Sequence, residues 1–100
     1  MNKRTKVYAE KIADVVKSFP LITKAVIVGP AVSDNFCFNE DIKLAIYTEK
    51  EAKISTVWMD LKNAFLDKEL YHIDIYMMAD KDFYCEVYNL IPNGEVIFEK

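Results

Sequence analysis

The sequence predicts an α+β protein with a single domain over residues 1–100: a mixed sheet of about four strands with three helices on one face. The chain length of 100 residues suits one domain. Three segments carry apolar residues at helical spacing, and four short segments either alternate or run apolar in the manner of strands. The expected order is helix, strand, loop, strand, helix, strand, helix, strand.

The first helix is expected over residues 4–18, where one apolar stripe recurs at helical spacing and Pro20 ends the pattern. The stripe consists of Tyr8, Ile12, Val15, Val16 and Phe19. Residues 24–29, "KAVIVG", are nearly all apolar and rich in valine. Such a run predicts a strand that is covered on both faces.

A loop is expected over residues 30–40, and a second strand over residues 41–47, "DIKLAIY". Side chains alternate between the two faces of a strand. One face of this strand therefore carries Ile42, Leu44 and Ile46, and the other carries Asp41, Lys43, Ala45 and Tyr47.

The second helix is expected to begin at a capping box formed by Thr48 and Glu51. Its buried face is predicted to consist of Ile54, Val57, Trp58, Leu61 and Phe65. Residues 71–78, "YHIDIYMM", then predict a third strand with Ile73, Ile75 and Met77 inward and His72, Asp74, Tyr76 and Met78 outward.

The third helix is expected after Asp80, which is a favourable helix cap, and to pack through Phe83, Val87, Leu90 and Ile91. A turn at Asn93-Gly94 leads to the last strand, "EVIFE". With the helices covering the inward face of the sheet, the outward face is expected to stay open. It carries three ionisable side chains from two separate strands: Asp41, Lys43 and Asp74.

The net charge of −3 provides no basic field for a nucleic-acid backbone, so nucleic acid is not expected as a partner. No apolar run reaches the roughly 20 residues that a membrane span needs, and no signal peptide is recognised. Cys37 and Cys85 are too few for a disulfide framework or a zinc site. We therefore expect a cytoplasmic protein with reduced thiols and no membrane contact.

From Lys24 to its end, the chain resembles the minimal nucleotidyltransferase family of the DNA polymerase beta-like superfamily. The residues that carry the likeness are Gly29 after an apolar strand, Asp41 opening the next strand and Asp74 on a later strand. The closing segment "NLIPNGEVIFE" is also similar to the last strand of that family. The resemblance implies a nucleotidyltransferase fold in which Asp41 and Asp74 are the catalytic, metal-binding residues and Gly29 lies at the nucleotide phosphates.

Two departures from the family pattern predict a degenerate site. Pro30 stands where the family has a phosphate-binding serine, and proline offers neither a hydroxyl nor an N–H. Lys43 stands where the second metal aspartate belongs. An ammonium in that position opposes a divalent cation, and it can itself neutralise Asp41 and Asp74.

Two classes of function therefore remain open. The first is an inactive binding module, possessing the family's fold and pairing with another protein; the resemblance implies a helical HEPN-type partner in a toxin–antitoxin system, and a homo-oligomer is the alternative. The second is a weakly active enzyme that moves a nucleoside monophosphate from a nucleoside triphosphate to a hydroxyl, with Mg²⁺ on Asp41 and Asp74. In that case Lys43, Gly29 and Ser33 are the candidate nucleotide-binding residues, although Ser33 also suits ordinary turn chemistry. A third reading is nucleotide binding without turnover.

Overall fold

The computed structural model describes residues 1–79 and 85–100, and its elements follow the expected order. The α+β class is confirmed, with three helices and a four-stranded mixed sheet. The helices are α1 (Lys3–Val16), α2 (Ile54–Asp67) and α3 (Cys85–Leu90). The strands are β1 (Ile22–Val28), β2 (Ile42–Thr48), β3 (Ile73–Met77) and β4 (Glu95–Glu99), and short 3₁₀ turns occupy Gly29–Val32 and Ile91–Asn93.

The strand order in the sheet is β3-β2-β1-β4. β1 runs antiparallel to both of its neighbours, whereas β2 and β3 are parallel. Parallel neighbours need a crossover connection, and α2 provides it. The consequence for function is that β2 and β3 begin at the same end of the sheet.

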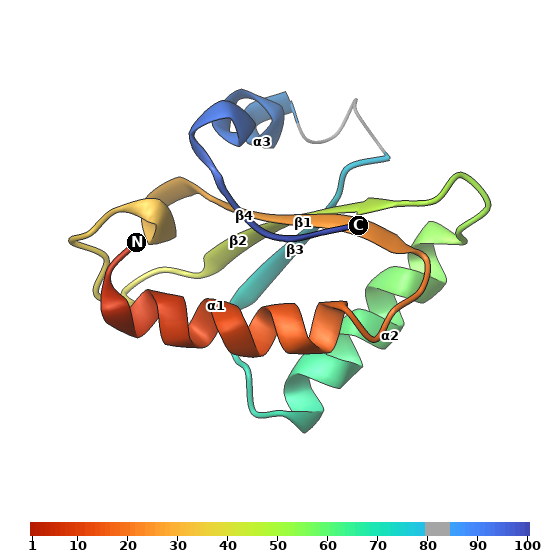
Figure 1. Ribbon diagram of the computed structural model, residues 1–100, viewed down its shortest axis with the longest axis horizontal. Coiled ribbons are helices and arrows are strands. Elements are labelled where there is room, and N and C mark those ends of the chain that lie inside the picture. The colour runs from red at the N-terminus through yellow and green to blue at the C-terminus, as the bar shows by residue number, and fades with distance from the viewer. Residues whose placement is uncertain (80–84) are drawn as a thin grey trace.

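The helices lie on both faces of the sheet, so the prediction of three helices on one face is wrong. Figure 1 shows α1 and α2 beneath the sheet and α3 above it. The sheet needs this cover because Val26, Val28 and Ala45 point away from α1 and α2, and they form a second apolar cluster with Met78 and Val87. Tyr88 also joins α3 to the end of β3, because its hydroxyl donates to the carbonyl of Met78. The expected cap of the third helix, Asp80, and its Phe83 lie outside the described residues.

The larger core lies between the sheet and the pair α1 and α2. The side chains predicted to point inward from the second and third strands are all buried there: Ile42, Leu44, Ile46, Ile73, Ile75 and Met77. The valine-rich β1 contributes to both clusters, with Ala25 and Ile27 on one side and Val26 and Val28 on the other. Its expected burial on both faces is confirmed.

The predicted start of the second helix is wrong. Thr48 ends β2, where it pairs with Ile22, and the N–H of Glu49 donates to the carbonyl of Leu21. The chain is thus held to the sheet beyond the expected capping box, and α2 begins only at Ile54. Trp58, expected in the buried face, is 38% exposed.

Asn2 joins the start of α1 to the loop after β1. Its side-chain oxygen accepts hydrogen bonds from the N–H and the hydroxyl of Thr5, both at 2.8 Å. Its amide nitrogen donates to the carbonyls of Asp34 at 3.2 Å and Phe36 at 2.8 Å. One side chain therefore caps a helix and fixes a loop, and it also satisfies the fully buried hydroxyl of Thr5.

Replacing Asn2 by alanine is expected to lower the free energy of unfolding by about 2 kcal/mol, because the cap and the partner of a buried hydroxyl are lost together. The matched variant Asn2→Ser keeps a capping oxygen but has no amide to donate to the loop, so about half of that loss is expected. Urea denaturation measures both. Equal losses in the two variants would show that the capping oxygen contributes nothing, whereas an unchanged stability of Asn2→Ser would show that the bonds to Asp34 and Phe36 contribute nothing.

Candidate functional site

The parallel pairing of β2 with β3 brings the predicted site residues to one end of the sheet. Lys43 lies directly opposite Asp74 in the register of the two strands. Asp41 immediately precedes β2, and the N–H of Ile42 donates to the carbonyl of His72 at 2.9 Å. Asp41 and Asp74 are both exposed and line one pocket of about 340 Å³ between α2 and β3.

His72 is part of this arrangement, although the sequence pattern placed it only among the outward side chains of the third strand and not among the site residues. Its Nδ1 lies 3.6 Å from Oδ1 of Asp41, and both side chains line the pocket. The backbone of His72 has φ 60°, a left-handed conformation that histidine adopts more readily than most residues. Because this conformation is not that of a strand, β3 begins at Ile73 and not at residue 71 as expected.

The segment before His72 is held by Tyr8 of α1. The hydroxyl of Tyr8 donates to the carbonyl of Tyr71 at 2.8 Å. Burial raises the pKa of Tyr8 above its ordinary value of 10.0, so the hydroxyl keeps its proton and its donor role well above neutral pH. The first helix thereby positions the approach to β3.

Lys43 makes a different contact from the one expected. Among residues 1–79 and 85–100 its ammonium forms no ion pair within 4.0 Å, and Asp74 instead accepts a hydrogen bond from the hydroxyl of Tyr76 at 3.2 Å. The stem of Lys43 packs over Gly29, which has φ 75°. A Cβ atom built on Gly29 would lie 3.3 Å from Cδ of Lys43 and 4.0 Å from Cδ1 of Leu90.

The loop after Gly29 is organised by local bonds. Pro30 lies in the 3₁₀ turn, where its missing N–H leaves no lost hydrogen bond within the turn. Ser33 follows the turn, and its hydroxyl oxygen accepts a bond from the N–H of Asn35 at 3.1 Å. Ser33 is thus engaged in turn chemistry, the ordinary reading of a Ser-Asp pair in a loop.

The donor set at this end of the sheet does not fit a two-ion site. Nucleotidyl transfer by paired metal ions needs several carboxylates around the ions, and here the side chain between Asp41 and Asp74 is a lysine. In the part of the chain that the structure describes, no group of three or more histidine, cysteine, aspartate or glutamate side chains is placed to hold a metal ion. Asp41, His72 and Asp74 remain as a polar cluster at the mouth of a pocket.

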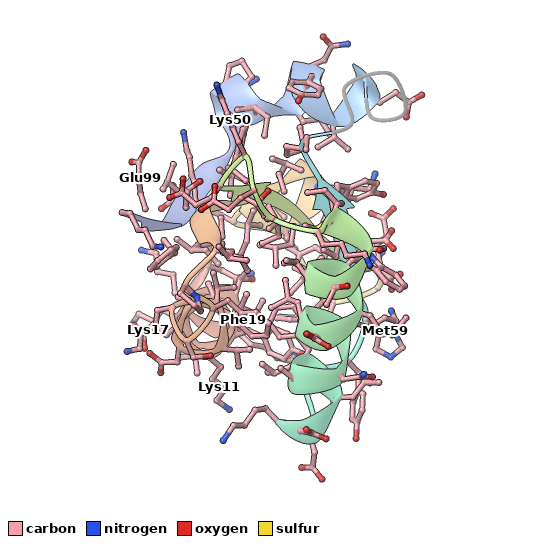
Figure 2. All side chains as sticks on the ribbon, turned by 90° about the vertical axis from the view of Figure 1, so that its right-hand side faces the viewer. Lys11, Lys17, Phe19, Lys50, Met59 and Glu99 are labelled. Carbon is pink, nitrogen blue, oxygen red and sulfur yellow. The ribbon has the colours of Figure 1, made fainter. Side chains whose placement is uncertain are left out.

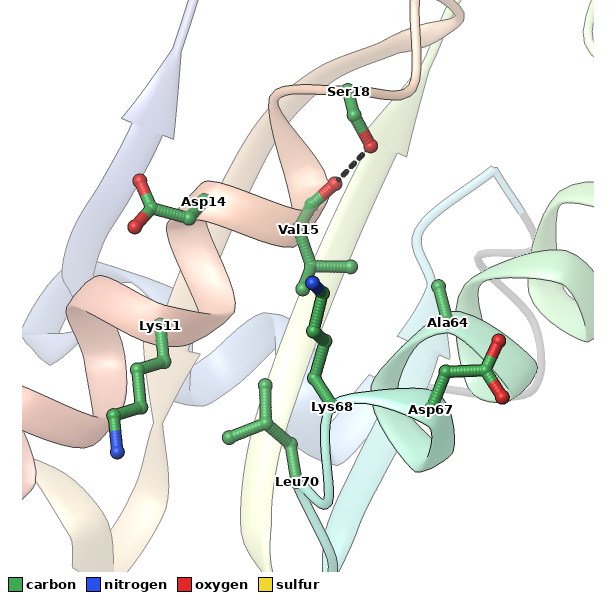
Figure 3. Close-up of a pocket in the computed structure, with 8 residues that line it drawn as sticks. All are labelled: Lys11, Asp14, Val15, Ser18, Ala64, Asp67, Lys68 and Leu70. Carbon is green, nitrogen blue, oxygen red and sulfur yellow. Dashed lines mark hydrogen bonds between the residues drawn. The ribbon is translucent and has the colours of Figure 1, made fainter.

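A larger hollow of about 560 Å³ lies elsewhere, between α1 and α2 (Figure 3). Its floor is apolar, with Val15, Ala64 and Leu70, and lysine and aspartate side chains stand at its rim. The hydroxyl of Ser18 donates to the carbonyl of Val15 at 2.7 Å, so its proton is directed at the backbone of α1. None of the residues singled out from the sequence as site residues lines this groove.

No protein-family model matches the chain, and no curated protein matches it either. Within the described ranges, none of the helices has the length and apolar character needed to cross a membrane.

Proposed function

We propose that this chain is a protein-binding domain of the nucleotidyltransferase type whose transfer site has lost its function. The order of elements supports the relationship: an apolar strand ends at Gly29, an aspartate opens the next strand, and Asp74 lies on the neighbouring parallel strand. The partner is a helical protein of the HEPN type, as the resemblance implies. The expected setting is the cytoplasm, where the exposed Cys37 stays a free thiol.

The contact of Lys43 and Leu90 with Gly29 carries this proposal. In the family, the glycine turn lies against nucleotide phosphates. Here the space directly over Gly29 is filled by the stem of Lys43 and by the side chain of Leu90 at the end of α3. A phosphate on this side of Gly29 would have to displace the stem of Lys43, and Pro30 would offer it no N–H donor.

A second candidate, weak metal-dependent transfer of a nucleoside monophosphate, is favoured by one observation. Asp41 and Asp74 line the same pocket and are exposed, as residues that meet a metal and a substrate must be. In this alternative Asp74 would act as the base toward the acceptor hydroxyl, and Mg²⁺ and a nucleoside triphosphate would be required.

Label transfer separates the two candidates. The protein is incubated with labelled ATP or GTP, with Mg²⁺ or Mn²⁺ and cell lysate, beside a matched Asp41→Asn/Asp74→Asn variant. We expect no transfer above that of the variant. Transfer by the parent that disappears in the variant would overturn the proposal and establish the enzyme. Co-purification with a small helical protein encoded beside it, and equal co-purification of the variant, would support the binding role directly.

Restoring the family residues is expected to restore metal binding. A unit charge about 4 Å away contributes about 4 kcal/mol at an effective dielectric near 20, and about twice that for a divalent ion. Lysine can turn its amine toward water, so we take about a third of that value. The double variant Lys43→Asp/Pro30→Ser should then bind Mg²⁺ roughly a hundredfold more tightly than the parent.

Isothermal titration calorimetry measures this change, with Lys50→Asp as the control. Lys50 is exposed in the turn between β2 and α2, so its replacement changes the net charge equally without touching the pocket. Equal Mg²⁺ affinities in the double variant and the parent would show that the loop geometry no longer suits a metal.

A further inference from the structure

β3 forms one edge of the sheet, and its outer side has no strand partner in the described part of the chain. Two hydrogen bonds show which backbone groups of β3 point toward β2. The N–H of Ile42 donates to the carbonyl of His72, and the N–H of Met78 donates to the carbonyl of Ile46. In a parallel pair of strands, every second residue directs its backbone N–H and carbonyl toward the same neighbouring strand. The backbone groups of Asp74 and Tyr76 therefore also point toward β2. The N–H and carbonyl groups of Ile73, Ile75 and Met77 therefore point outward.

This edge lacks the features that usually protect a sheet edge. β3 contains no proline and no lysine, its pairing with β2 has no bulge, and Asp74 is its only charge. Apolar side chains stand beside it: Met59 and Leu66 of α2 are 57% and 47% exposed. Figure 2 shows Met59 on the side of the molecule where β3 ends the sheet. As far as residues 1–79 and 85–100 show, the edge therefore offers both unpaired backbone groups and apolar surface.

We propose that β3 pairs antiparallel with β3 of a second copy of this chain, about a two-fold axis at Ile75. In this register Ile75 lies opposite Ile75 of the second copy, and Ile73 lies opposite Met77. The outward N–H and carbonyl groups then form the hydrogen-bonded pairs of the new ladder. The two sheets become one continuous sheet, and the exposed sides of the two α2 helices approach each other on the same face.

The side chains of Asp74 and Tyr76 favour a second copy of the chain as the partner of β3, in the register centred on Ile75. Asp74 of one copy lies opposite Tyr76 of the other, and the two residue types already bond within one chain at 3.2 Å. Shifting the register so that Ile73 faces Ile75 would place Asp74 opposite Asp74, and like charges directly opposite are destabilising. The charge of Asp74 thus favours the register centred on Ile75 over the one centred on Asp74. This inference does not depend on the proposed loss of nucleotide transfer.

Sedimentation velocity over a range of micromolar concentrations tests the association. We expect a species of twice the chain mass of 11.6 kDa. In the same samples, amide hydrogen exchange at Ile73, Ile75 and Met77 should slow as the concentration rises. A chain that stays a monomer, or a dimer in which these three amides exchange at the monomer rate, would overturn the proposal. Binding of an extended peptide to β3 of a monomer would likewise exclude the second copy as occupant.

Disulfide cross-linking tests the register. Asp74→Cys and Tyr76→Cys are made in separate chains whose Cys37 and Cys85 are replaced by serine and alanine. Residues opposite each other in a narrow antiparallel pair have Cα atoms about 4.5 Å apart, within the roughly 4.4 to 6.8 Å that a disulfide spans. Only the mixture of the two variants should yield a linked dimer on oxidation. Equal linkage of Asp74→Cys with Glu99→Cys, on the opposite edge strand β4, would contradict the proposal.

Discussion

Phe65→Ala is expected to lower the free energy of unfolding by about 3 to 5 kcal/mol. Phe65 is 2% exposed and is among the largest fully buried side chains, in the core between α2 and the sheet. Truncation removes its burial and leaves a cavity in the core. Because a domain of this size has only about 5 to 15 kcal/mol of stability, the variant should lose a large share of it.

Thermal denaturation followed by circular dichroism measures this effect. The expected fall in the melting temperature is roughly 15 °C or more. Val7→Ala is the matched control, because Val7 is also an apolar residue in a helix but is 54% exposed. It should change the free energy of unfolding by less than about 0.5 kcal/mol. A similar loss in both variants would mean that burial in this core does not determine stability.

Gly94→Ala is expected to destabilise the protein by about 3 kcal/mol through overpacking. Gly94 stands where the chain enters β4 and passes close to the central strand. A Cβ atom on it would lie 2.6 Å from Cγ1 of Val26 and 3.0 Å from the carbonyl oxygen of Ile27. Neither atom can easily move, since Val26 is 1% exposed with a stiff β-branched side chain and the carbonyl belongs to β1.

A double-mutant cycle with Val26→Ala identifies the cause of the loss. Removing the methyl group that meets the new Cβ should make Gly94→Ala cost less in the Val26→Ala background than in the parent. Denaturant unfolding supplies the four free energies. An undiminished cost in that background would place the strain elsewhere, at the carbonyl of Ile27 or in the turn before Gly94. Asn93→Ala, an exposed neighbour in the same turn, serves as the control.

The sequence predicts the elements of this fold better than their arrangement. β1 is recognisable because its apolar run serves two cores, and β2 because its alternation separates Leu44 from Lys43. The face on which α3 lies could not be read in the same way. Its apolar residues Val87 and Leu90 would suit either face, and the six-residue helix gives little periodic signal. The start of α2 depends on how far Thr48 stays paired to β1, which is a tertiary interaction.

The position of Asp41 and Asp74 at one pocket was predictable because both stand at the beginning of strands, and a helix between those strands favours parallel pairing. The other contacts at the site depend on single backbone conformations. His72 lies 3.6 Å from Asp41 and has a positive φ, a conformation that strand alternation does not predict. The packing of Lys43 on Gly29 follows from the pairing of Val28 with Lys43 across β1 and β2. A long loop joins those strands, so the sequence does not determine that register.

The central position of β1 has a consequence for synthesis of the chain. One side of β1 pairs with β2, but the other pairs with β4, so that Lys24 meets Glu99. As the polypeptide leaves the ribosome, the valine-rich strand emerges before β4 and lacks that neighbour until β2, α2, β3 and α3 have been translated. During that interval the unpaired backbone groups of β1 can bond to other chains and cause aggregation. We therefore expect nascent or truncated chains lacking residues 95–99 to depend on chaperones far more than the finished protein does.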